Sequence, residues 1–160
     1  MDLSVVPDLT MRGQDDPHGR AAGVRPPTLG QLAARVRHLA ARPAEWWGLV
    51  RFDPAGAVHV PLDDRTWLTT WPPGPGAPIP AQVSTLVAGE LAEVTITAHG
   101  VTERPLRANR IRVHGGAPGA SPAEPRRDPR DGAQSLTNPG PAFAVSLHAG
   151  AVRPWDLPTT

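Results

Sequence analysis

The chain contains no cysteine, no lysine and no tyrosine. The absence of cysteine excludes disulfides, thiolate metal sites and a cysteine nucleophile. All sixteen basic residues are therefore arginines. The use of arginine without lysine, together with many alanines, glycines and prolines, is typical of a GC-rich coding sequence. The abundance of these residues therefore does not by itself indicate a function.

Two further absences narrow the class of protein. No segment approaches the run of about 20 apolar residues that a membrane helix needs, and residues 1–28 lack the apolar core of a signal peptide. We therefore expect a cytoplasmic protein without membrane contact. The net charge is only +1 and the arginines are scattered along the chain. Because nucleic-acid binding needs basic residues gathered on one face, we expect no nucleic-acid partner.

The N-terminal third predicts a leader followed by helices. Residues 1–27 are polar and rich in glycine and proline, and we expect them to be a disordered leader. Thr28 is a candidate N-cap for an amphipathic helix over residues 29–42, which Pro43 stops. A second short helix is expected over residues 44–50. It should carry two tryptophans into the core, Trp46 and Trp47.

The remainder predicts a mainly β domain over residues 28–152, with a barrel over 57–150. Short runs with alternating or β-branched residues are typical of strands in a sandwich or barrel, and a small jelly roll is the expected form. The candidate strands are 57–62, 66–71, 83–87, 90–98, 110–114 and 142–148. Two proline-rich stretches do not fit: residues 72–80 predict a turn or irregular edge, and 115–132 a Pro/Arg-rich insertion loop. Residues 153–160 form a tail.

A series of motifs follows in fixed order. Trp71-Pro-Pro-Gly-Pro-Gly-Ala-Pro-Ile79 leads into Pro80-Ala-Gln82, and Gly89-Glu-Leu91, Gln134-Ser-Leu-Thr-Asn138-Pro-Gly-Pro and Ala144-Val-Ser-Leu-His148-Ala come later. In order and spacing this resembles the cysteine dioxygenase family of cupins, in its short bacterial form, over residues 29–150. The resemblance implies a double-stranded jelly roll beside one or two N-terminal helices. It also implies iron(II) as cofactor and oxidation of a thiol to its sulfinic acid as activity.

The residues at the family's iron-ligand positions differ from the family pattern. The resemblance implies three histidines where this chain has Pro80, Gln82 and Gln134. A proline side chain has no donor atom, and a glutamine amide oxygen holds transition metals poorly compared with imidazole. We therefore predict no metal at these positions and no cofactor, with iron(II) bound only if the family activity is retained.

The resemblance assigns roles to two histidines. His59 stands where the family has an arginine that pairs with the substrate carboxylate, and an imidazolium could hold the same group. His148 survives from the family's Ser-x-His-x-Tyr ending, in which Gly150 replaces the tyrosine, and is the candidate catalytic residue. The expected ligand is a small carboxylate or thiol. A new metal cluster of His59, His114 and His148 inside the barrel is an alternative without a ligand-spacing signature.

Three functions follow from these residues. The first is a cysteine dioxygenase-like cupin that has lost iron and thiol oxidation, a pseudoenzyme with a binding or structural role. The second is an active iron-dependent thiol dioxygenase that uses the histidine cluster. The third is a metal-free isomerase or lyase with His148 as general base. The sequence does not identify a protein partner.

Overall fold

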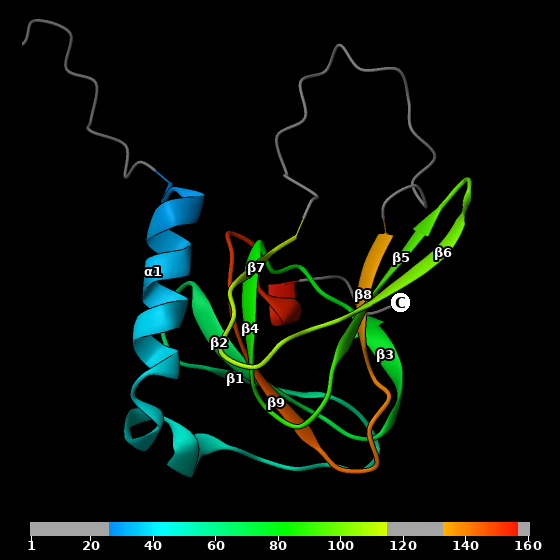
Figure 1. The fold of residues 1–160 in the computed structure, drawn as a ribbon. Helices are drawn as coiled ribbons and strands as arrows, with labels where there is room; N and C mark the ends of the chain where they lie inside the picture. The colour runs from blue at the N-terminus through cyan, green and yellow to red at the C-terminus, as the bar shows by residue number, and fades with distance from the viewer. Residues whose placement is uncertain (1–25, 115–132, 157–160) are drawn as a thin grey trace, which may run out of the picture.

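The computed structural model describes residues 26–114 and 133–156 (Figure 1). Helix α1 (Leu29–Ala40) comes first, and two 3-10 turns follow it, η1 (Pro43–Glu45) and η2 (Trp47–Leu49). The strands of the described residues are β1 (Val58–Pro61), β2 (Thr66–Trp71), β3 (Gly74–Pro78), β4 (Val83–Ala88), β5 (Ala92–Thr97), β6 (Gly100–Pro105), β7 (Arg112–Val113), β8 (Ala133–Asn138) and β9 (Ala144–Ala149). A last 3-10 turn is η3 (Pro154–Asp156). The predicted insertion loop and nearly all of the predicted leader lie outside the described residues.

The strands form two antiparallel sheets, with the orders β1-β2-β9-β4-β7 and β3-β8-β5-β6. The strands β2, β3, β4 and β5 pair in turn with β9, β8, β7 and β6. This nested pairing is that of one long hairpin, and its wrapping also brings β4 beside β9 and β5 beside β8. Such an order defines a double-stranded jelly roll, the architecture that cupins share with several capsid and lectin domains. The predicted mainly β jelly roll is confirmed.

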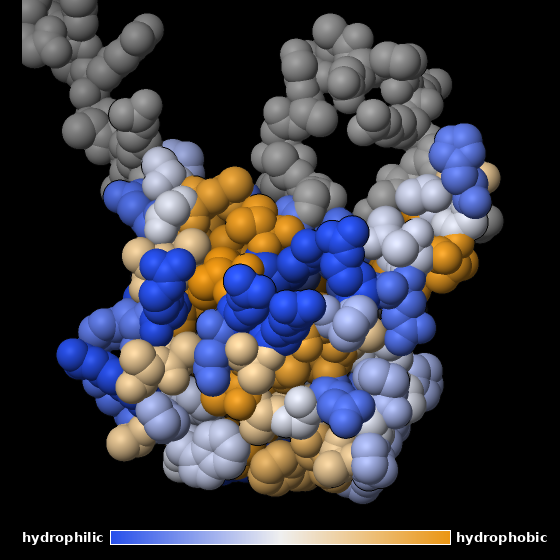
Figure 2. Space-filling view, in the orientation of Figure 1, coloured by the Kyte–Doolittle hydropathy of each residue, from blue (hydrophilic) through white to orange (hydrophobic). Residues whose placement is uncertain are grey.

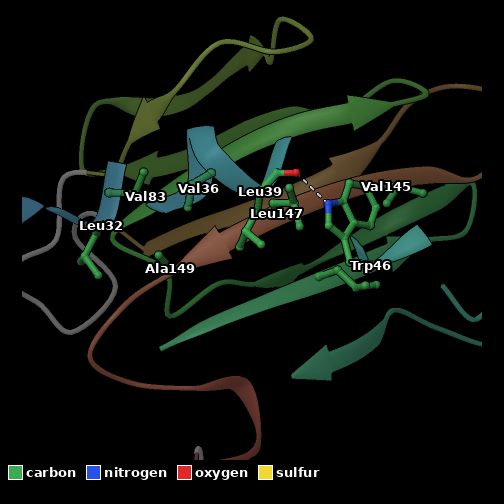
Figure 3. Close-up of a cluster of buried hydrophobic side chains, with 9 residues drawn as sticks. Leu32, Val36, Leu39, Trp46, Val83, Val145, Leu147 and Ala149 are labelled. Atoms are coloured by element: carbon green, nitrogen blue, oxygen red, sulfur yellow. Dashed lines mark hydrogen bonds between the residues drawn. The ribbon is translucent and has the colours of Figure 1, made fainter. Parts of the chain in front are cut away.

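Helix α1 covers the outer face of the first sheet. The Thr28 hydroxyl accepts the Gln31 backbone N–H and the Gln31 side chain accepts the Thr28 N–H, so a reciprocal capping box starts the helix. Figure 3 shows the apolar layer between helix and sheet, with Trp46 Nε1 donating to the Leu39 carbonyl at 2.8 Å. The buried members of this layer are Leu32, Val36, Leu39, Trp46, Leu68, Val83, Val145, Leu147 and Ala149.

The structure corrects the predicted second helix. Helix α1 ends at Ala40, and the next segment forms two 3-10 turns, since proline begins one turn and glycine lies in the other. Trp46 is buried as expected, but Trp47 is 47% exposed and does not enter the core. No helix among the described residues is long and apolar enough to cross a membrane.

The proline-rich segment over residues 72–80 also differs from its prediction, because it contains strand β3. This strand lies at the edge of the second sheet, where the missing N–H of proline removes no interior ladder bond. Its pairing with β8 shifts register between Gly74 and Ala77. The prediction of an irregular edge therefore described its position but missed its strand character.

Candidate functional site

Polar side chains line the space between the two sheets. Alternate residues of a strand share a face, so Trp67 and Trp71 of β2 face the interior while Leu68 packs under α1. The register of β4 and β9 places Ser84 directly opposite His148, and both residues are 0% exposed. The interior is thus built from indole rings and hydrogen-bonding groups.

His148 lies between two tryptophans. Its ring stacks on Trp67 with centroids 5.7 Å apart, and its Nε2 is 2.6 Å from Ser146 Oγ, which also accepts Trp71 Nε1–H at 2.7 Å. Its Nδ1 is buried and has no hydrogen-bond partner among the described residues. Burial, helped by two nearby histidines, lowers the pKa of His148 well below its ordinary value. The ring is therefore neutral at pH 7, and its full burial counts against the predicted catalytic role.

His59 faces the same interior from β1. Its Nδ1 is 2.9 Å from Thr69 Oγ1, and its ring meets Trp71 edge-on with centroids 6.3 Å apart. Burial lowers the pKa of His59. The charged imidazolium that would hold a carboxylate is therefore disfavoured, and the predicted ligand-binding role rests on the resemblance alone.

A second polar group surrounds Glu93 of β5, which is 2% exposed. His114 Nδ1 is 2.8 Å from Glu93 Oε1, and His114 Nε2 is 2.5 Å from Ser84 Oγ. The other carboxylate oxygen, Oε2, accepts hydrogen bonds from Arg112 Nε, at 2.8 Å, and from Arg112 Nη2. A carboxylate only accepts, so His114 Nδ1–H donates to it, and the Nε2 of the neutral ring accepts the Ser84 hydroxyl proton.

The protonation states of this group follow from burial and pairing. Burial acts to raise the pKa of Glu93, but the hydrogen bonds and charges of His114 and Arg112 bring that pKa below its ordinary value. Burial lowers the pKa of His114, although the hydrogen bond and charge of Glu93 oppose the shift. At pH 7 the Glu93 carboxylate is therefore charged and the His114 imidazole is neutral.

The order Ser84–His114–Glu93 is that of a serine hydrolase relay, in which a carboxylate orients the base that activates the hydroxyl. A nucleophile must reach its substrate, however, and Ser84 is fully buried. Ser84 belongs to the first sheet and Glu93 to the second. The relay therefore ties the two sheets together across the interior.

The Glu93 group borders a pocket at the surface. This pocket, of about 220 Å³, is lined by Glu93, Thr95, Thr102, Arg104 and Arg112. The pairing of β5 with β6 puts Glu93 beside Arg104 and Thr95 beside Thr102, so these side chains share the inner face of the second sheet. We call this the mouth pocket. It presents hydroxyls and guanidinium groups to a ligand.

The residues at the family's iron positions do not fit a ferrous site. Pro80 has no side-chain donor, and the Gln82 amide oxygen already accepts the Ala151 N–H at 3.2 Å. The position of the family tyrosine is tight as well, because a Cβ on Gly150 would lie 3.2 Å from the Pro80 carbonyl oxygen and would require a small backbone shift. Gln134 stands opposite Thr95 in the register of β8 and β5, and neither of these strands contains a histidine.

The alternative histidine cluster does not fit a metal either. The structure does bring His59, His114 and His148 to one interior, as the hypothesis required. Each ring is hydrogen-bonded to its own hydroxyl or carboxylate partner. Within residues 26–114 and 133–156, no three His, Asp or Glu side chains are grouped so that they could hold a metal ion.

Comparison with known proteins adds little to this description. No family model matches the chain, and no curated protein matches it. Among solved structures, a cupin domain from Bordetella pertussis Tohama I is similar at 17% identity, with 63% of this chain and all of that chain covered and a TM-score of 0.34. A likeness of this size carries no argument about family or function. The jelly-roll assignment rests on the strand order.

Sequence reasoning missed Glu93, Arg104 and Arg112, the charged residues of the mouth pocket. Two signals were present. The stretch Ala-Glu-Val-Thr-Ile-Thr of β5 alternates, so that Glu93 and Thr95 fall on one face. Four of the sixteen arginines fall within residues 104–112, and this local density was obscured by the view that the arginines are scattered.

Proposed function

We propose that this chain is a metal-independent, cupin-type protein that binds a small ligand at the mouth of its jelly roll and does not oxidise thiols. It corresponds to a cysteine dioxygenase-like protein that has lost its iron. One observation carries the proposal: the side chains at the three ligand positions are a proline and two glutamines, and the amide oxygen of Gln82 is already used by the backbone. Thiol oxidation in this family depends on the iron that those positions would hold.

The mouth pocket supports a binding role. Thr95 and Thr102 offer hydroxyls, and Arg104 offers a planar fork that matches carboxylate or phosphate oxygens. Arg112 already donates from Nε and Nη2 to Glu93, which leaves its Nη1 for a ligand. Arg112 is held in place by Glu93, so its orientation is set before a ligand arrives, which lowers the entropic cost of binding. The isomerase or lyase alternative lacks such support. Its proposed base, His148, is fully buried between the Trp67 and Trp71 rings, where a substrate does not reach it.

The experiment is the iron content of protein expressed with added iron and purified without chelator, combined with oxygen consumption in the presence of cysteine and of cysteamine. We expect iron far below stoichiometric amounts and no thiol-dependent oxygen uptake. Near-stoichiometric iron with thiol-dependent uptake would overturn the proposal. It would make substitution of His59, His114 and His148 the next step, because these are the imidazoles of the interior.

A further inference from the structure

A second pocket, of about 520 Å³, adjoins the mouth pocket. It is lined by Arg104, Pro105, Leu106, Arg107, Arg110, Ile111 and Arg112, and we call it the arginine pocket. Figure 2 shows a strongly hydrophilic patch in the middle of the face it draws, with hydrophobic side chains on either side. Arg104 and Arg112 line both pockets, so the two pockets are neighbours.

The backbone under the arginine pocket is fixed. Its segment crosses from β6 to β7, and the Leu106 N–H donates to the Leu91 carbonyl at 2.8 Å. A tight turn follows, closed by the Arg110 N–H on the Arg107 carbonyl, with Asn109 at a φ of 57°. Asparagine is among the residues that tolerate this left-handed conformation best. Arg107 and Arg110 therefore project from the two ends of one rigid turn.

The turn is also tied to the first sheet. The Asn109 N–H donates to the Leu86 carbonyl at 2.8 Å, and Thr85 Oγ1–H donates to the Arg110 carbonyl at 3.0 Å. Leu86 and Thr85 both belong to β4, which is an interior strand of the first sheet. Guanidinium groups carried on a fixed backbone lose little main-chain entropy when a ligand binds.

The charges of the arginine pocket are mostly uncompensated. Arg112 pairs with Glu93, but no hydrogen bond or ion pair joins the side chain of Arg104, Arg107 or Arg110 to another described residue. Other arginines of the described residues do form ion pairs with carboxylates, among them Arg35–Asp63, Arg42–Glu45 and Arg153–Asp156. Neighbouring like charges repel each other and create a local positive potential that attracts anions.

We propose that the arginine pocket binds a small molecule carrying two or more anionic groups of the carboxylate or phosphate type. Guanidinium forks suit these groups, and the pocket volume lies in the range of about 300–1,000 Å³ typical of small-molecule sites. Leu106 and Ile111 provide an apolar surface for the body of the ligand. The inference rests on the proposed function in that it extends the binding role from the mouth pocket to the neighbouring arginine pocket and names the ligand class. A nucleic acid fits less well, because only four of the sixteen arginines line the pocket and the chain as a whole carries a net charge of only +1.

The test is isothermal titration of the full chain with glutarate, which has two carboxylates, and with phosphoglycolate, which has one phosphate and one carboxylate. Inorganic phosphate serves as the single-group reference. We expect at least one two-group probe to bind more tightly than phosphate. The double variant Arg107→Ala/Arg110→Ala should weaken its binding about tenfold or more, as expected for the loss of charge-assisted hydrogen bonds.

The matched control is Arg37→Ala/Arg42→Ala, which removes the same amount of charge from exposed positions at and just beyond α1. This control should retain wild-type affinity. Equal weakening in both double variants, or no binding of any probe, would overturn the inference. The titrated protein is also assayed for iron: stoichiometric iron contradicts the proposed function and leaves anion binding standing, while failed titration with iron-free protein contradicts the anion site alone.

Discussion

Glu93 is a charged carboxylate in the interior of a small domain. Removing a carboxylate from water costs several kcal/mol unless its partners make up the loss. Here His114 and Arg112 supply hydrogen bonds to both carboxylate oxygens. The charge therefore stays in place because it is fully paired, and the pairing depends on residues from both sheets.

Replacing Glu93 should consequently be costly. Glu93→Ala leaves the buried His114 Nδ1–H and the Arg112 guanidinium without their acceptor, and we expect a loss of about 3 kcal/mol in the free energy of unfolding. Urea denaturation followed by tryptophan fluorescence measures it. Glu103→Ala is the control, since this exposed residue of β6 should change stability by less than about 0.5 kcal/mol. Equal effects in the two variants would contradict the buried pairing.

Stability should also fall on mild acidification. His59, His114 and His148 all have pKa values below the ordinary 6.5 in the folded state. Between the lowered and the ordinary values the unfolded chain binds more protons, so each histidine destabilises the fold by up to about 1.4 kcal/mol per unit as pH drops below about 6.5. The lowered pKa of Glu93 acts in the same direction only further down, below its ordinary 4.5. Urea unfolding across the range from mildly alkaline to mildly acidic pH tests this expectation, which a flat profile would contradict.

The candidate site could be predicted only in part from these residues. The histidines of the barrel segment, His59, His114 and His148, do face one interior, as the alternative cluster required. The protonation and hydrogen bonding of these rings could not be predicted from the sequence, because they depend on spatial neighbours such as Thr69, Ser84 and Ser146. Whether a buried imidazole is a ligand, a base or a neutral hydrogen-bonded ring depends on those partners.

At the scale of elements, β3 shows how a sheet accommodates a strand rich in proline and glycine. Its Gly76 lies against β8 so closely that a Cβ would be 1.7 Å from the Leu136 carbonyl oxygen. The obstacle is backbone, which cannot rotate away. Glycine is thus required here for close approach of two chains, and not for an unusual dihedral angle.

Gly76→Ala should therefore separate β3 from β8 and cost more than about 2 kcal/mol of unfolding free energy. Gly56→Ala is the matched control, since nothing lies within 4 Å of a Cβ built at that position. Thermal unfolding of the two variants gives the comparison. A melting temperature for Gly76→Ala equal to that of the control would show that β3 does not lie against β8 as described.

Strands β6 and β8 were also missed from the sequence, for different physical reasons. Strand β6 is exposed along its whole length and so has no buried face to impose alternation. Strand β8, Ala-Gln-Ser-Leu-Thr-Asn, contains a single β-branched residue and is held by its neighbours β3 and β5. Strands β2 and β4 were predictable because their own side chains are buried and β-branched or aromatic.

At the scale of the whole molecule, the larger apolar cluster and the buried polar groups occupy different layers. The main apolar cluster lies between α1 and the outer face of the first sheet, and a smaller one includes Trp71, Leu86 and Leu136. The polar groups of His148 and Glu93 fill the interior beside the mouth pocket. Because apolar burial dominates folding, we infer that the α1 layer carries most of the stability.

Metal removal should then leave the fold unchanged. In a protein whose strands are joined by a bound metal, the free energy of metal binding contributes to the stability of the fold. Chelation removes this contribution and lowers the melting temperature. Here the described sheets are joined by the Glu93 relay and by apolar packing, so dialysis against o-phenanthroline should shift the melting temperature by less than about 1 °C. Glutarate or phosphoglycolate at about 100 times its dissociation constant should instead stabilise the fold by about 2.7 kcal/mol. A fall on chelation that iron(II) restores would point to a metal site among the interior histidines.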